Sequence, residues 1–271
     1  MKLVVLVDNN TFIDRYYYGE PAVCYYLEDG KDNVLLDVGY SDIFIKNAQL
    51  LDIDLSAVTT IAISHGHNDH TRGLQYLSQS INFAQTKIVA HPDAFKPRFY
   101  DNQPVGAPFN EQTLSRMCLL KLSKKPVKIT EKITFLGEIP SSNQFEMRQN
   151  LGNIIDEQTK QSQIDYVMDD TALVYQGKAG LFIITGCSHS GICNIVEYAK
   201  QVCGDDRVIG IIGGFHLMDI SPQLSDTIAY FKAHNITMLY PCHCVSFAAK
   251  VEINKAIPIF DVGVGLTIEI D

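Results

Sequence analysis

The 271-residue chain lacks any apolar run long enough to cross a bilayer. Residues 209–217, one of its longest apolar stretches, include three glycines and fall well short of the roughly 20 residues required. The apolar start, residues 1–7, is cut off by Asp8 and has no small-residue cleavage site, so it predicts a first strand rather than a signal peptide. We therefore expect no membrane partner.

The chain also has no excess of positive charge. The chain has 22 Lys and Arg against 31 Asp and Glu, which gives a formal net charge of −9. Such a field repels a polyanion, so we expect no nucleic-acid partner. The seven cysteines are odd in number and irregular in spacing, which fits reduced thiols better than a disulfide framework. These features predict a cytoplasmic protein, and no pattern indicates its oligomeric state.

Short repeats and low-complexity tracts are absent. With 46% hydrophobic and 20% charged residues, the composition is that of a globular protein, and the length suffices for one large domain over residues 1–271. Hairpin-like strands dominate the first third, whereas strands and helices alternate from about residue 171 onward, which favours mixed sheets covered by helices. Between them, residues 92–130 are rich in proline and aromatic residues and lack clear periodicity. We interpret this range as a lid-like insertion.

One segment stands out for its chemistry: His65, His67, Asp69 and His70 follow an apolar strand within a run of seven polar or small residues. Two residues apart on extended chain, His65 and His67 point the same way and can share one metal ion. After a turn, Asp69 and His70 can face a second ion. Imidazole and carboxylate ligands together suit Zn²⁺ first, with Fe or Mn as alternatives.

Further ligands are expected at the ends of other strands. His189 and His243 each follow an apolar strand, as His65 does, and we predict both to be metal ligands. His216 follows a strand and two glycines, a pattern equally consistent with a metal ligand, a substrate contact or neither. His91, directly before a proline, is interpreted as structural, and His234 as a cap at the end of a helix.

Cysteines flank these histidines. A Cys187 thiolate could serve as a soft metal ligand, but a free cysteine is also a common small core residue. The same two interpretations hold for Cys242 and Cys244, whose side chains on extended chain would point away from His243.

The run from His65 to His70, which follows Leu36-Asp37-Val38-Gly39 and an apolar strand, resembles the signature of the metallo-β-lactamase superfamily. The resemblance spans nearly the whole chain. Three later motifs, 185–191, 213–217 and 241–244, are similar to the branch named after a dihydropterin–ribofuranosyl-aminobenzene-phosphate synthase of methanopterin biosynthesis. The resemblance implies an α/β fold, an αββα sandwich of two mixed sheets with helices on the outer faces and the site along one edge.

The resemblance also implies a ligand set of one or two Zn²⁺ ions. His65, His67 and His189 would hold the first ion, and Asp69, His70 and His243 the second. Asp37 would orient the histidine loop by hydrogen bonding rather than bind metal. The sequence departs from the family at Gly186-Cys187, where a Gly-Asp pair usually supplies a carboxylate that bridges both ions. Whether Cys187 takes over that position is left open.

These observations predict a metal-dependent hydrolase in which a metal-bound hydroxide attacks a small anionic ester, a phosphoester before a lactone or thioester. Asp69 would bind metal and also accept the proton of the water. Two alternatives remain: a synthase that condenses a pterin with an aminobenzene, and a non-catalytic metal- or redox-sensing protein in which Cys187 blocks the second site. Five lysines between 121 and 132 could attract the anion or merely line a solvated hairpin.

Overall fold

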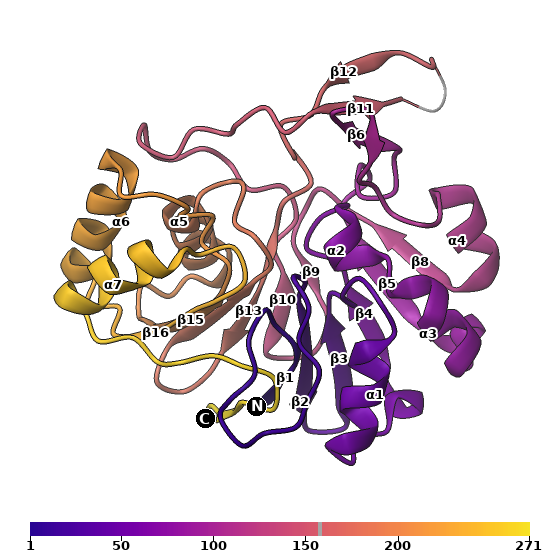
Figure 1. Ribbon diagram of the computed structural model, residues 1–271, viewed down its shortest axis with the longest axis horizontal. Coiled ribbons are helices and arrows are strands. Elements are labelled where there is room, and N and C mark those ends of the chain that lie inside the picture. Colours follow the sequence, from indigo (N-terminus) through magenta and orange to yellow (C-terminus); the bar gives the residue numbers. More distant parts are fainter. Residues whose placement is uncertain (157–158) are drawn as a thin grey trace.

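The chain folds into two mixed sheets packed face to face, with helices on both outer faces (Figure 1). The computed structural model describes residues 1–156 and 159–271. In the first sheet the strands β17, β1, β2 and β3 pair antiparallel, and β3, β4, β5 and β8 pair parallel. In spatial order this sheet runs β17 (Thr267–Glu269), β1 (Lys2–Val7), β2 (Cys24–Asp29), β3 (Asp32–Leu36), β4 (Thr60–Ala62), β5 (Lys87–Ala90) and β8 (Leu119–Leu122).

The second sheet is also mixed, since its parallel strands β14, β15 and β16 continue into antiparallel pairs with β13, β10 and β9. Because β14, β15 and β16 run parallel, the loops that follow them leave the sheet at one edge. In spatial order it runs β16 (Met238–Pro241), β15 (Val208–Gly213), β14 (Leu181–Thr185), β13 (Ala172–Gln176), β10 (Ile133–Phe135) and β9 (Val127–Lys128).

Helices cover the outer face of each sheet and enclose an apolar core there. Helices α1 (Ile43–Leu50), α3 (Leu74–Ser80) and α4 (Glu111–Met117) lie on the first sheet, with the short helices α2 (Asn68–Thr71), η1 (Leu55–Ala57) and η2 (Phe83–Gln85) beside them. Helices α5 (Ile192–Cys203), α6 (Pro222–Ala233) and α7 (Phe247–Ala256) lie on the second sheet. A third core between the sheets joins side chains of both, for example Val5 and Phe182.

The expected α/β architecture of two mixed sheets with outer helices is therefore confirmed. Local capping supports the helices: at the start of α6 the Ser221 side chain accepts a hydrogen bond from the backbone of Leu224, and Pro222 occupies the first turn. Residues 68–80 form two helices, α2 and α3, rather than one continuous helix. Gly73 lies between them, so close to the backbone of Val38 that an added Cβ would be 1.9 Å from its carbonyl oxygen.

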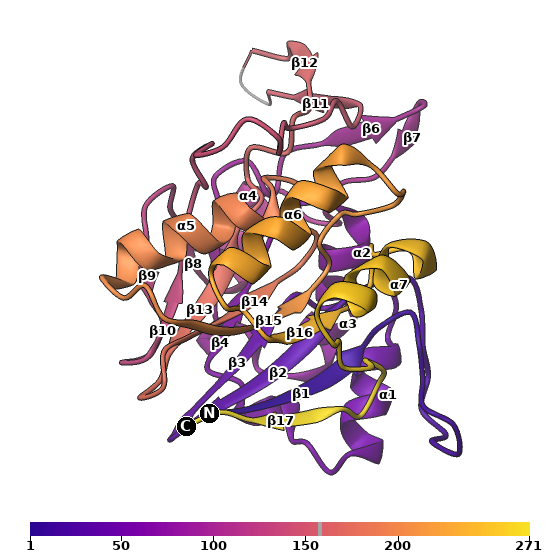
Figure 2. The same ribbon diagram turned by 90° about the vertical axis from the view of Figure 1, so that its left-hand side faces the viewer.

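The range 92–130, expected as a lid, contributes to two different parts of the fold. Strands β6 (Arg98–Tyr100) and β7 (Gln103–Pro104) join β11 (Asn153–Ile155) and β12 (Ser162–Ile164) in a small separate sheet. Figure 2 shows this small sheet projecting beyond the ends of the larger strands. The range also holds α4 and β8, and β8 is an edge strand of the first sheet. That later part therefore belongs to the sandwich, whereas β6 and β7 belong to the small sheet.

The two chain ends lie side by side at the opposite end of the molecule from the small sheet (Figure 2). The amino group of Met1 donates a 2.6 Å hydrogen bond to the carbonyl oxygen of Ile270, next to the paired strands β1 and β17. Among the described residues we find no helix whose length and apolar character would let it span a bilayer.

Candidate metal centre

Loops that follow β4, β14, β15 and β16 bring the predicted ligands to one edge of the sandwich. His65 and His67 lie in the turn after β4, and His189 and His243 follow β14 and β16. The backbone at His67 is still extended, with φ −67° and ψ 150°, and the helix α2 begins at the next residue. This change from extended to helical chain is what directs His65 and His67 one way and Asp69 and His70 another.

His65, His67 and His189 form the first donor group. One ring nitrogen from each lies within 4.8 Å of the other two, and His65 Nε2 is 3.0 Å from His67 Nδ1. The Nε2 atom of His189 is buried and has no hydrogen-bond partner among the described residues. Because a buried polar atom without a partner costs free energy, this nitrogen is an available ligand atom.

Asp69, His70 and His243 form the second donor group, also within 4.8 Å. The Asp69 Oδ2 atom lies 3.5 Å from His70 Nε2 and 3.4 Å from His243 Nε2. Cys187 lies between the two groups: its Sγ is 3.2 Å from His70 Nε2, and its thiol converges with His65 and His70 and also with His243 and Cys244. The thiol thus occupies a position from which it faces both groups.

Asp37 supports the loop from behind, where its carboxylate is fully buried. Its Oδ1 accepts a hydrogen bond from the Ser64 backbone, and its Oδ2 accepts one from the Ser64 hydroxyl, both at 2.7 Å. Oδ2 also lies 2.7 Å from His70 Nδ1. An N–H at Nδ1 that donates to this carboxylate leaves Nε2 of His70 free to face the site. Gly186 permits this packing, since an added Cβ would lie 2.2 Å from the Ser64 hydroxyl.

The pKa values of the histidines in the first donor group and the pKa of His70 in the second are shifted in opposite directions. Burial lowers the pKa of His65 and of His189 well below the ordinary value, and burial together with the Arg98 guanidinium lowers the pKa of His67 to about 4. These rings are neutral at pH 7, the form that binds metal. In the second group burial opposes ionisation, but the Asp69 and Asp37 carboxylates raise the pKa of His70, and His70 and His243 keep the pKa of Asp69 low.

The remaining histidines lie in different surroundings. The His216 ring contacts the His189 ring in a tilted arrangement, with ring centroids 4.4 Å apart and an angle of 55° between the planes, but His216 belongs to neither donor group among the described residues. His91 is buried, and its Nε2 lies 3.1 Å from the Glu138 carboxylate. His234 is the residue at which α6 ends, as a helix cap is expected to be. The Cys242 thiol contacts the hydroxyl of Tyr25.

A cavity of about 500 Å³ opens above the donor groups. The small sheet and its connections supply Tyr100, Val105 and Leu151 to its wall, so part of the predicted lid does border the site. None of the five lysines between 121 and 132 lines the cavity as described. The full described lining is Asn9, Pro21, His67, Asn68, Asp69, Tyr100, Val105, Leu151, Cys187, His189, His216, Met218, His243 and Cys244.

Sequence reasoning missed Asp8 and Asn9, which hold the His243 loop. The Asp8 carboxylate accepts a 3.0 Å hydrogen bond from the His243 backbone, and Asn9 Oδ1 lies 3.3 Å from His243 Nδ1. The contact stabilises His243 at φ +51°, a left-handed conformation that is unusual outside glycine. A signal was present, because these two polar residues directly follow the apolar strand β1, as the metal loops follow theirs.

Comparison with known proteins agrees with this arrangement. The sequence profile described as the metallo-beta-lactamase superfamily matches residues 17–199, more than half of the chain. The chain belongs to the metallo-beta-lactamase superfamily. The match includes the whole run from His65 to His70 and also His189, whereas His243 lies beyond it.

Two proteins of Methanocaldococcus jannaschii are similar over most of the chain. An uncharacterised protein is 30% identical over 253 residues, which cover 93% of each chain. The second, 7,8-dihydropterin-6-methyl-4-(beta-D-ribofuranosyl)-aminobenzene-5'-phosphate synthase, is 30% identical over 230 residues, 81% of this chain and 78% of its own length. The resemblance to the synthase branch is thereby confirmed.

Solved structures of the superfamily have the same fold. Tm1679, described as a metal-dependent hydrolase of the beta-lactamase superfamily, is 28% identical with a TM-score of 0.85, covering 100% of this chain and 99% of its own. A diphosphatase from the PhnP family is 14% identical with a TM-score of 0.55, covering 100% of this chain and 98% of its own, which shows a shared fold alone.

The donor set fits the metal chemistry of the metallo-beta-lactamase superfamily, whose members bind metal ions, usually zinc, and are usually hydrolases. The fit rests on this chain's own atoms: three neutral imidazoles, one of them with an unpartnered buried nitrogen, and a neighbouring carboxylate with two imidazoles. Nitrogen, carboxylate and thiolate are the usual ligands of Zn²⁺ in proteins.

Proposed function

We propose that this protein is a metal-dependent hydrolase of a small anionic ester, a phosphoester before a lactone or thioester. One observation carries the proposal: two donor groups lie side by side, with the Cys187 thiol facing both, and each group contributes side chains to the lining of one cavity. Adjacent divalent ions of that kind suit in-line displacement at phosphorus, since one can stabilise the attacking and the other the leaving oxygen.

In this proposal His65, His67 and His189 would hold the first ion, and Asp69, His70 and His243 would hold the second. Zn²⁺ is the expected metal, with Fe or Mn as alternatives. Bound ions of this type polarise the ester and lower the pKa of water toward neutrality. Cys187, whose thiol lies beside both sets of donors, would stand where the superfamily usually has a carboxylate.

Asp69 is the proposed catalytic residue. The His70 and His243 rings keep its carboxylate ionised, so it can accept the proton of the attacking water while it remains at the edge of the cavity. Asp37 keeps the His70 ring in one orientation through its buried hydrogen bond.

The cavity wall favours a substrate with an uncharged, partly planar portion. Tyr100, Val105, Leu151 and Met218 border the cavity, and its described lining contains no lysine or arginine. The negative charge of the scissile group would therefore be balanced by the bound ions and not by basic side chains. We propose small anionic esters as the partners, with neither nucleic acid nor membrane.

We assign this activity to the cytoplasm. No disulfide is formed among the described cysteines, and Cys187 and Cys244 lie unpaired within the cavity lining. A reducing compartment keeps such thiols available as ligands.

A second candidate is the synthase reaction, in which a pterin condenses with an aminobenzene. It is favoured by the 30% identity to the archaeal synthase, together with the exposed ring of Tyr100 on the cavity wall, where a planar heterocycle could stack. Incubation of the protein with a dihydropterin pyrophosphate and the arylamine tests it. Coupled product would favour the synthase, and its absence beside ester hydrolysis would exclude it.

Metal-loaded protein is expected to hydrolyse bis(p-nitrophenyl) phosphate, and removal of metal by a chelator is expected to lower the rate more than about a hundredfold. Zn²⁺, Mn²⁺ or Fe²⁺ added back should restore it, which controls for damage by the chelator. Release of p-nitrophenol at 405 nm is the measurement, in parallel with carboxyl esters and lactones. Cleavage of those but of no phosphoester would contradict the proposed substrate class. One tightly held ion without any turnover would instead favour the metal- or redox-sensing alternative.

A further inference from the structure

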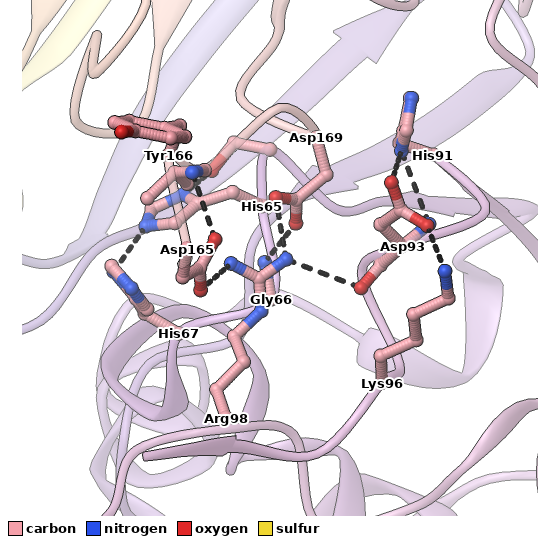
Figure 3. Close-up of polar contacts among 12 residues, drawn as sticks. His65, Gly66, His67, His91, Asp93, Lys96, Arg98, Asp165, Tyr166 and Asp169 are labelled. Atoms are coloured by element: carbon pink, nitrogen blue, oxygen red, sulfur yellow. Dashed lines mark hydrogen bonds and ion pairs between the residues drawn. The ribbon is translucent and has the colours of Figure 1, made fainter. Parts of the chain in front are cut away.

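A buried arginine connects the small sheet to the loop that carries His65 and His67, called the metal loop below. Arg98 begins β6, and only 1% of its surface is exposed. Its guanidinium lies 2.7 Å from Asp165 Oδ2 and 2.5 Å from Asp169 Oδ1, and it also donates to the carbonyl oxygen of Asp93 at 3.1 Å. Figure 3 shows both carboxylates next to the planar head group. Two acidic partners fit the fork of an arginine better than the point charge of a lysine.

Asp169 extends this contact to the metal ligands themselves. Its second oxygen, Oδ2, accepts a 2.7 Å hydrogen bond from the backbone N–H of Gly66, the residue between His65 and His67 (Figure 3). The backbone at Gly66 is tightly enclosed, because an added Cβ would lie 2.1 Å from the carbonyl oxygen of Ala94. The position of two ligands of the first donor group is thus fixed by one carboxylate that Arg98 holds.

Neighbouring contacts reinforce the same segment. The next residue, Asp170, accepts hydrogen bonds from the backbone and hydroxyl of Ser190 at 2.9 and 2.5 Å, beside the third ligand His189. From the small sheet, the carbonyl oxygen of Val105 accepts a 2.8 Å hydrogen bond from the backbone of Asn68. The loop that carries His65 and His67 is therefore held on one side by Asp169 and on the other by Val105.

We propose that Arg98 and Asp169 are positioning residues of the metal centre: they fix the His65–His67 loop for metal binding and couple it to the wall that bears Tyr100. The ion pair with Arg98 holds the Asp169 carboxylate in place, and that carboxylate in turn holds the Gly66 backbone through its hydrogen bond. Hydrogen-bonded groups behind metal ligands commonly change affinity or activity by about 10- to 100-fold when removed. The effect on metal affinity does not depend on which ester is the substrate, although the effect on turnover rests on the proposed function.

Asp165 provides a matched control within the same cluster. It pairs with the same arginine as Asp169, at 2.7 Å, and is likewise buried. Its remaining oxygen accepts from the backbone of Val167, however, and not from the metal loop. A purely structural role of the cluster predicts equal consequences for the loss of either carboxylate, whereas the positioning role does not.

The experiment compares Asp169→Ala with Asp165→Ala in the full chain. Zn²⁺ affinity is measured by competition with a chromophoric chelator, and the Tm of the metal-free proteins by circular dichroism. We expect Asp169→Ala to weaken Zn²⁺ binding about 10-fold or more and Asp165→Ala less than about 3-fold, at similar losses in Tm. In assays with a hydrolysed ester, Asp169→Ala should lower kcat at saturating metal, while Arg98→Lys should retain part of it.

Equal losses of Zn²⁺ affinity in the two variants would overturn the proposal, as would an unchanged affinity in Asp169→Ala. If either alanine variant does not fold, Asp169→Asn and Asp165→Asn replace the pair, with the same ordering expected at several-fold. A protein that hydrolyses no ester, but whose Asp169 variant alone loses Zn²⁺ affinity, would disprove the proposed function and leave the positioning role intact.

Discussion

Replacement of Asp69 by asparagine is expected to lower kcat/KM for a phosphodiester by about 10²- to 10⁴-fold. Asp69 supplies the only carboxylate in the donor groups of the described residues, and it lies within 3.5 Å of both His70 and His243. Asparagine keeps the size of the side chain but removes the negative charge that binds a cation and accepts a proton. Steady-state kinetics with a chromogenic ester measure the loss, and elemental analysis should show fewer bound ions per chain.

Asp42→Asn is the control for that variant. Asp42 is a carboxylate beside α1 that pairs with Lys46 in an exposed position, so its loss should leave the kinetics within about twofold, as for ordinary surface ion pairs. Asp69→Asn protein with full activity and an undiminished metal content would show that this carboxylate neither binds an ion nor handles a proton.

Replacement of Asp37 by asparagine is expected to have the largest effect on stability together with a loss of metal affinity. The buried carboxylate serves the Ser64 backbone, the Ser64 hydroxyl and His70 Nδ1, all at 2.7 Å. An amide offers one oxygen and turns an N–H₂ group toward a donor, which leaves at least one buried group unpaired. We expect a loss of about 3 kcal/mol in the free energy of unfolding of metal-free protein and a 10- to 100-fold weaker affinity for Zn²⁺.

Asn47→Ala separates the two effects. Asn47 is equally buried and holds the backbones of Leu6 and Tyr18, on elements away from the metal loop, so its removal should destabilise the protein without changing Zn²⁺ affinity. Denaturant unfolding and chelator competition provide the two measurements. An Asp37→Asn variant that loses stability but binds Zn²⁺ as tightly as the unmodified protein would contradict the orienting role.

Much of the fold could be predicted because local patterns and tertiary structure agree. The apolar start of the chain forms strand β1, and the alternation of strands and helices expected from about residue 171 onward runs from β13 to α7. The extent of the lid was harder to predict. Strand β8 is an exposed edge strand with no distinctive alternation, and only its parallel pairing with β5 assigns it to the first sheet.

The donor groups were accessible to sequence reasoning because a short histidine run and the ends of parallel strands fix positions locally. His189 and His243 are separated by 54 residues, yet strand order alone brings their loops to one edge. The residues that position the metal loop could not be predicted in this way. Arg98 and Asp169 have no motif around them, and their pairing arises from tertiary contact across 71 residues.

Glu146 illustrates a missed signal of another kind. Helix α5 begins after Gly191, which has no side chain to cap it, and the Glu146 carboxylate accepts from the backbones of Cys193 and Asn194 at 2.8 Å instead. The absence of a local cap before an otherwise clear helix indicated that a distant group would serve it. The sequence did not identify that group, because 47 residues separate the partners.

An anomalous-difference map from crystals grown with excess zinc tests the central claim most directly. The account predicts one ion among His65, His67 and His189, and a second among Asp69, His70 and His243, with the Cys187 sulfur beside both. Zinc-saturated crystals with no anomalous peak among these side chains would contradict it.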